Sequence, residues 1–133
     1  HRIFPNYFKN FVFISVGVVD WKNFKGAEEV KNLESHISEE LKKYVQLSKN
    51  FGFHAESIHS VEIDTLSAVE ERCEEIQRKY NKAVFFVGKL VFEEENLFTR
   101  FLHNQTAYSI QRILQFKGIP SIVLPIRVIK TVK

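Results

Sequence analysis

The sequence has no methionine, a single cysteine (Cys73), one tryptophan, five glycines and three prolines. One cysteine excludes an internal disulfide bond, which fits a reducing environment. The small number of glycines and prolines excludes a low-complexity chain. Because the chain begins at His1 and has no methionine, we expect that it is cut from a longer protein.

Two other features are absent. No run of about 18 apolar residues is present, so the chain is not expected to span a membrane, and no signal peptide is recognisable. The net charge is +3, with basic and acidic residues interleaved along the chain. Since no stripe of Arg and Lys with aromatics between them stands out, nucleic-acid binding is not expected.

What is present is typical of one folded domain covering residues 1–133, with 44% apolar and 26% charged residues. Apolar runs and helical spacings alternate along it. They predict strands over 11–19, 55–63, 83–88 and 121–128. They also predict helices over 28–50, from an N-cap at Asp64 as far as Tyr80, and over 105–116. Gly52 and Gly118 stand where helix-ending glycines are expected.

This alternation predicts an α/β fold, a three-layer sandwich with a mostly parallel sheet between helices. The first and third strands are apolar throughout, which indicates central positions. The second strand is more polar, and the fourth contains Pro125, so both are expected at the edges. The simplest strand order is 2-1-3-4.

A ligand in such a sheet binds beyond the carboxyl ends of the strands, where the strand order reverses. The first and third strands would present Val18 and Asp20, and Gly88 and Lys89, at that point. The third helix would begin nearby with a polar cluster. The cluster consists of His103, Asn104, Gln105 and Thr106. Free N–H groups at a helix start favour an anion, so these eight residues form a hypothetical ligand crevice.

The polar cluster also has a second interpretation, in which Asn104 only caps the helix. The sequence leaves both open. Histidines at metal-ligand spacing and nucleophile turns are absent, so no metal or catalytic residue is predicted. Cys73 lies on the apolar stripe of the second helix and is expected in the core.

The phrases "FPNYFKNFVFISVGVVD" with "FKGAEEV", and "AVFFVGKLVF" with "LHNQTAYSIQR" and "LPIRV", carry a family resemblance. They resemble the cytosolic C-terminal domain of bacterial permeases of the amino acid-polyamine-organocation superfamily. That domain is similar in turn to the universal stress protein fold, a flavodoxin-like sheet that often binds adenine nucleotide.

The resemblance implies a regulatory or assembly domain of a membrane amino acid or cation permease, without catalytic activity, on the cytoplasmic side of the inner membrane. It implies that a βα unit before "FPNYFKN" is missing here. The partners it implies are the transmembrane portion of the same permease and a second copy that pairs through the last strand. The alternative is a soluble stress-protein-like module that binds ATP or AMP. Gly88 matches the first glycine of the nucleotide motif, Val91 replaces the second, and Thr106 keeps a hydroxyl near the third.

Overall fold

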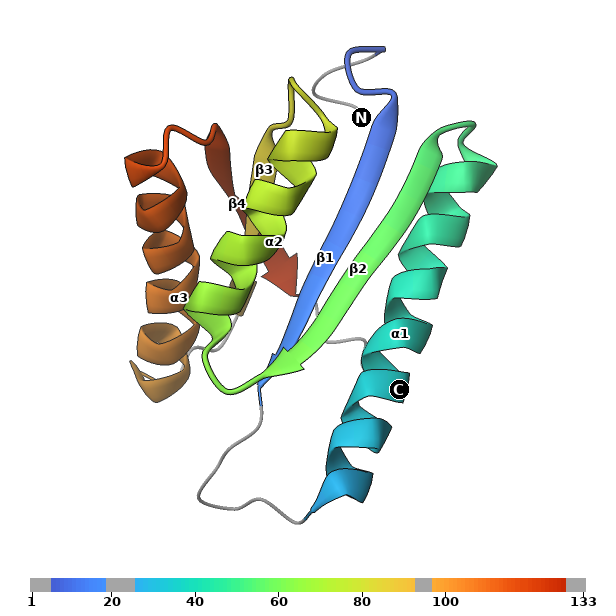
Figure 1. Ribbon diagram of the computed structural model, residues 1–133. Coiled ribbons are helices and arrows are strands. Elements are labelled where there is room, and N and C mark those ends of the chain that lie inside the picture. Colours follow the sequence, from blue (N-terminus) through green and yellow to red (C-terminus); the bar gives the residue numbers. More distant parts are fainter. Residues whose placement is uncertain (1–5, 19–25, 93–96, 129–133) are drawn as a thin grey trace. The chain divides into compact units, whose positions relative to one another are not determined.

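The computed structural model describes residues 6–18, 26–92 and 97–128. Strands and helices alternate over these residues (Figure 1). The elements are β1 (Asn10–Val18), α1 (Ala27–Asn50), β2 (His54–Glu62), α2 (Thr65–Lys79), β3 (Phe85–Phe92), α3 (Leu97–Phe116) and β4 (Ser121–Val128). The chain divides into two compact units, His1–Ala68 and Val69–Lys133, and α2 runs across the boundary.

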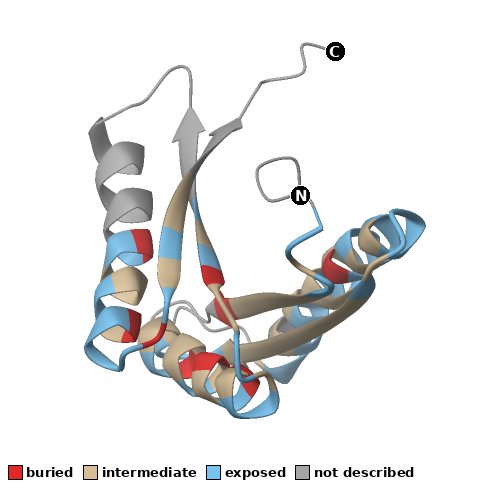
Figure 2. Cartoon of the chain, turned by 90° about the horizontal axis from the view of Figure 1, so that it is seen from above, coloured by how far each residue is buried: buried red, intermediate tan, exposed pale blue. Residues whose placement is uncertain are grey.

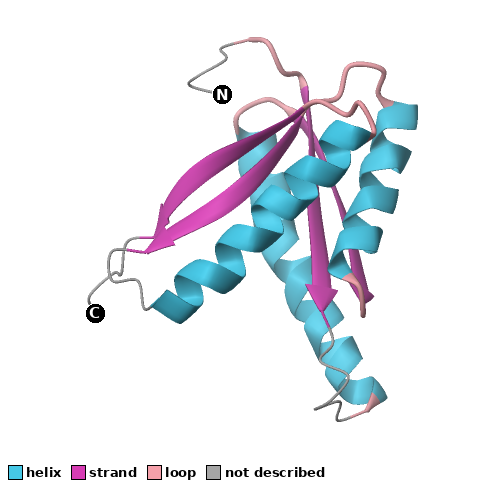
Figure 3. Cartoon of the chain, turned by 90° about the vertical axis from the view of Figure 1, so that its left-hand side faces the viewer, coloured by secondary structure: helices cyan, strands magenta, loops and turns pink. Residues whose placement is uncertain are grey.

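In the first unit, β1 and β2 form a parallel pair, and α1 packs against both strands (Figure 3). The register runs from Asn10 opposite His54 to Val18 opposite Glu62. A Cβ atom on Gly17 would lie 2.6 Å from Cδ1 of Ile37 and 3.2 Å from Cδ2 of Leu33. Glycine at this position therefore lets α1 lie close to the strand.

The end of α1 confirms the prediction made for Gly52. This glycine has φ +82°, a left-handed conformation that side chains disfavour. Its N–H donates to the carbonyl of Lys49 at 2.9 Å, and the N–H of Phe53 donates to the carbonyl of Ser48 at 3.1 Å. This pair of bonds is the Schellman motif, which satisfies carbonyls that the helix leaves free.

In the second unit, β3 and β4 form another parallel pair, and α3 packs against both strands. Buried residues gather in this unit (Figure 2). They are Cys73, Ile76, Phe85, Ala107, Leu114 and Ile119. The helix ends with the same motif as α1: Gly118, at φ +69°, donates to Gln115, and Ile119 donates to Leu114.

Asp64 caps α2, as predicted. Its carboxylate accepts hydrogen bonds from the N–H of Leu66 at 3.0 Å and from the hydroxyl of Ser67 at 2.6 Å. These bonds favour the charged form, so the pKa of Asp64 is lowered. Further along α2, Glu70 and Glu74 each pair with Lys117 at 2.7 Å, which ties this helix to the residue after α3.

The α/β class and the alternation of elements are confirmed. The two neighbour pairs of the predicted order, 2-1 and 3-4, are also present. The described residues show no bridge between β1 and β3, so the order across four strands, the three-layer sandwich and the resemblance to stress proteins stay predictions.

Candidate functional site

Two residues of the predicted crevice lie elsewhere on their strand than expected. We predicted Gly88 and Lys89 at the carboxyl end of the third strand. In the structure β3 continues to Phe92, and Gly88 and Lys89 lie in its middle, opposite Leu124 and Pro125 of β4. All eight residues of β4 pair with β3, so β3 is hydrogen-bonded along its length as far as Phe92. The predicted position of Gly88 and Lys89 at the strand end is therefore wrong, and their contact with a ligand stays a prediction.

The polar cluster His103–Thr106 is also misplaced by the sequence prediction. The helix α3 begins at Leu97, not near Gln105, so the cluster lies beyond its first turn. Backbone N–H groups at those positions bond within the helix. Asn104 is therefore not a cap, and the helix offers no free N–H groups here for an anion.

The remaining residues of the predicted crevice are not brought together in the described part of the chain. Val18 ends β1 in the first unit, opposite Glu62, and Asp20 lies outside the described residues. Thr106 is exposed on α3. A ligand contact through side chains of these residues stays a prediction.

Cys73 is a core residue, as predicted. Its side chain is 2% exposed, and burial raises the pKa of the thiol to about 12. A thiol needs a lowered pKa to act as a nucleophile near neutral pH. The structure thus gives Cys73 a packing role.

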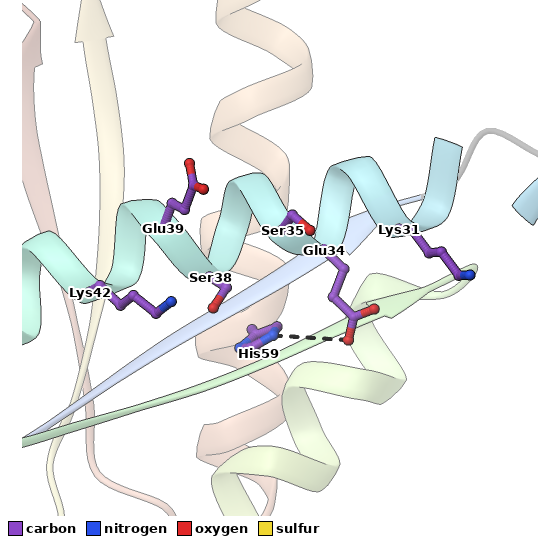
Figure 4. A pocket seen from close by; sticks show the side chains of 7 residues that line it. All are labelled: Lys31, Glu34, Ser35, Ser38, Glu39, Lys42 and His59. Carbon is purple, nitrogen blue, oxygen red and sulfur yellow. Dashed lines mark ion pairs between the residues drawn. The ribbon is translucent and has the colours of Figure 1, made fainter. Parts of the chain in front are cut away.

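The described residues contain a different candidate site, a polar pocket between α1 and β2 in the first unit (Figure 4). Its volume is about 400 Å³. The lining residues are Lys31, Glu34, Ser35, Ser38, Glu39, Lys42 and His59. Six of them recur every three or four residues along α1, which places them on one side of the helix.

His59 is the one lining residue from the sheet. Nε2 of its ring lies 4.0 Å from Oε1 of Glu34. That distance allows an ion pair when the ring is protonated, but it is too long for a direct hydrogen bond. Glu34 and Ser38 point toward His59, whereas Glu39 points away (Figure 4). The pocket can offer cations, carboxylates and hydroxyls to a small polar molecule or ion.

The pocket lacks features that would make it an active site. Among the described residues, no three His, Cys, Asp or Glu side chains come together to hold a metal ion. The lining is entirely polar, whereas sites for small molecules are usually lined by apolar residues. Sequence reasoning missed this pocket because it considered His59 only as a possible metal ligand. Placing His59 beside α1 requires the register of β1 with β2.

No described helix combines the length and hydropathy needed to cross a bilayer. Searches of known protein families, of curated proteins and of solved structures found no match to this chain.

Proposed function

We propose that this chain is a non-catalytic regulatory or assembly domain of a membrane amino acid or cation permease, on the cytoplasmic side of the inner membrane. The support is the resemblance carried by "FPNYFKNFVFISVGVVD" and "AVFFVGKLVF", together with an α/β chain of parallel strand pairs.

The observation that carries the proposal is the open edge of β1. In the described residues β1 pairs with β2, and no described strand is hydrogen-bonded to its other edge. Charged residues and proline commonly protect such edges. Every other strand has at least one, namely Glu56 and Glu62 in β2, Lys89 in β3, and Pro125 and Arg127 in β4. The segment Asn10–Val18 has none.

An unprotected, apolar strand belongs in the interior of a sheet. We therefore infer that β1 receives a further strand in the intact protein, from the βα unit that the resemblance implies. The domain would then be a universal stress protein-like sandwich. The resemblance also implies a second copy that pairs through β4, and because Pro125 has no backbone N–H, such a pairing would lack a ladder hydrogen bond at that position.

The deciding test starts with the parent gene. We expect several hydrophobic spans upstream of the segment that encodes His1, and co-purification of the domain with those spans in detergent. An open reading frame without such spans would refute the permease assignment.

Hydrogen exchange tests the strand addition. We compare this chain with one extended upstream by about 40 residues, enough for one βα unit. Amides on the open edge of β1 should exchange slowly only in the extended form. Equal exchange in both forms would contradict the added strand. Amides of β4 serve as the internal control.

The nucleotide-binding alternative receives no support from the described geometry, because α3 begins at Leu97 and Gly88 lies within β3. Calorimetric titration with ATP and AMP tests it directly. We expect no binding to either form of the chain.

A further inference from the structure

The polar pocket between α1 and β2 has a half-buried floor and an exposed rim. Ser38 and His59 form the floor, one from the helix and one from the strand. The side chain of His59 is 27% exposed, whereas that of Glu34, on the rim, is 56% exposed. Every residue that lines the pocket belongs to the first unit, so its geometry depends on that unit alone.

The charged groups of the lining balance one another. Two lysines, Lys31 and Lys42, stand against two carboxylates, Glu34 and Glu39, which gives no net charge when the His59 ring is neutral. No ion pair between described residues involves either lysine. Glu34 has His59 as its ionic partner, but the 4.0 Å between them is beyond hydrogen-bond reach. These groups can therefore form charge-assisted hydrogen bonds with a ligand.

Hydrogen-bond donors and the acceptor occupy different parts of the pocket. Ser38 and Lys42 are four residues apart on α1, so they lie one turn apart on one face, and Lys42 extends toward Ser38 (Figure 4). Glu34 lies one turn before Ser38, with its carboxylate toward His59 (Figure 4). We call Ser38, Lys42 and His59 the donor side of the pocket, and Glu34 its acceptor side.

We propose that this pocket binds a small zwitterion, namely a free amino acid with a polar side chain. The carboxylate of the ligand accepts hydrogen bonds from the donor side, and its ammonium group donates to Glu34. A ligand without net charge suits a lining without net charge, because each charged group then gains a partner of opposite sign. A polar side chain suits a lining that contains no apolar residue.

A nucleotide or another phosphorylated molecule fits this pocket less well. Its phosphate would bring negative charge beside the Glu34 carboxylate, and like charges repel. The lining also has no aromatic side chain on which a base could stack. Apolar linings are typical of sites for larger ligands, which have apolar surface to bury. A polar amino acid has little such surface, so an entirely polar lining can hold it.

The test is an NMR titration of the isotope-labelled chain with L-serine at constant ionic strength. We expect saturable shifts of the amide signals of the donor side and of Glu34. The dissociation constant should be on the order of 1 mM, because so small a ligand makes few contacts in an open site. Ethanolamine lacks the carboxylate of serine, and 3-hydroxypropionate lacks its ammonium group. Each should bind about fivefold more weakly than serine.

Two variants test the two sides of the pocket. Lys42→Gln removes the cation of the donor side, Glu34→Gln removes the acceptor, and each should weaken serine binding about fivefold. The matched controls, Lys49→Gln and Glu39→Gln, remove the same charges from the same helix. Lys49 does not line the pocket, and Glu39 points away from His59 (Figure 4), so both controls should bind serine as the unaltered chain does. Circular dichroism confirms that each variant is folded.

Three outcomes would overturn the proposal. The first is a titration in which serine gives no saturable shift, or gives shifts at other residues only. The second is binding of ethanolamine or 3-hydroxypropionate as tight as that of serine, since one charged group would then suffice. The third is an equal loss of serine binding in the matched controls.

This inference does not rest on the permease assignment. A parent gene without hydrophobic spans would refute that assignment and leave serine binding as an independent result. A pocket that does not bind serine would leave the permease assignment intact.

Discussion

Replacing Gly118 with alanine perturbs one backbone conformation and little else. Gly118 has φ +69°, and its N–H and that of Ile119 donate to the carbonyls of Gln115 and Leu114 at the end of α3. A Cβ atom at Gly118 would meet nothing within 4 Å. The substitution therefore causes no clash, and the cost comes from placing a side chain on a left-handed residue.

The magnitude follows from two opposing effects. A non-glycine residue in the left-handed region costs about 1–2 kcal/mol. Alanine also loses less conformational entropy on folding than glycine, which returns about 0.4–1 kcal/mol. The free energy of unfolding of Gly118→Ala should fall by about 1 kcal/mol. Gly118→Asn should lose less, because asparagine tolerates this conformation.

Urea unfolding followed by circular dichroism measures the effect. The denaturation midpoint should fall without a change in slope. Gly52→Ala is the matched variant in the first unit, since Gly52 has φ +82° and open space around it. The reasoning is refuted when Gly118→Ala is as stable as the unaltered chain, or when Gly118→Asn costs as much as Gly118→Ala.

Three further outcomes are expected. Cys73, with its raised pKa, should not react with a thiol reagent at pH 8 until the chain is unfolded, and rapid reaction of the native protein would contradict the core placement. The Asp64→Ala variant should have a lower free energy of unfolding than the unaltered chain at pH 7. Because the pKa of Asp64 is lowered in the folded state, the stabilisation by its carboxylate is fully present above the ordinary carboxyl pKa. That stabilisation is lost as the pH falls through the pKa of Asp64 in the folded state. The melting temperatures of the variant and the unaltered chain should therefore converge as the pH falls below the ordinary carboxyl pKa, and a difference that stays constant with pH would argue against the cap. Gly17→Ala should cost about 1 kcal/mol in urea unfolding, because its Cβ meets the end of the Ile37 side chain, and Ile37→Val in the same background should recover part of it.

The sequence predicted correctly those helix and strand ends that are determined by residues close to them in the sequence. The last strand was predicted at 121–128 and is β4, and Gly52 and Gly118 end helices as expected. Asp64 was predicted as a cap and accepts the hydrogen bonds of one. In each case the residue type at a single position determines the backbone geometry.

The errors concern elements whose limits depend on distant partners. Gly88 and Lys89 interrupt the apolar run of the third strand, and the sequence prediction ended it there. Pairing with β4 carries β3 on to Phe92. The sequence prediction began the third helix at Gln105, although Leu97, Phe98 and Phe101 continue an apolar helical pattern, and α3 begins at Leu97.

The polar pocket could not be predicted for a related reason. It needs His59 placed beside α1. That placement follows from the register of β1 with β2, which pairs residues far apart in the sequence. No periodicity within one segment encodes it.

The parallel register also has a consequence for folding kinetics. In the first unit, every paired residue has the same sequence separation from its partner as Asn10 has from His54. In the second unit, the sequence separation is that between Phe85 and Ser121. The entropic cost of closing such loops grows only with the logarithm of their length, so the two closures differ by about 0.2 kcal/mol. Loop length alone therefore does not predict that one unit folds faster than the other. The unit whose crossover helix forms more readily on its own should close first, and the long helix α1 gives that advantage to the first unit.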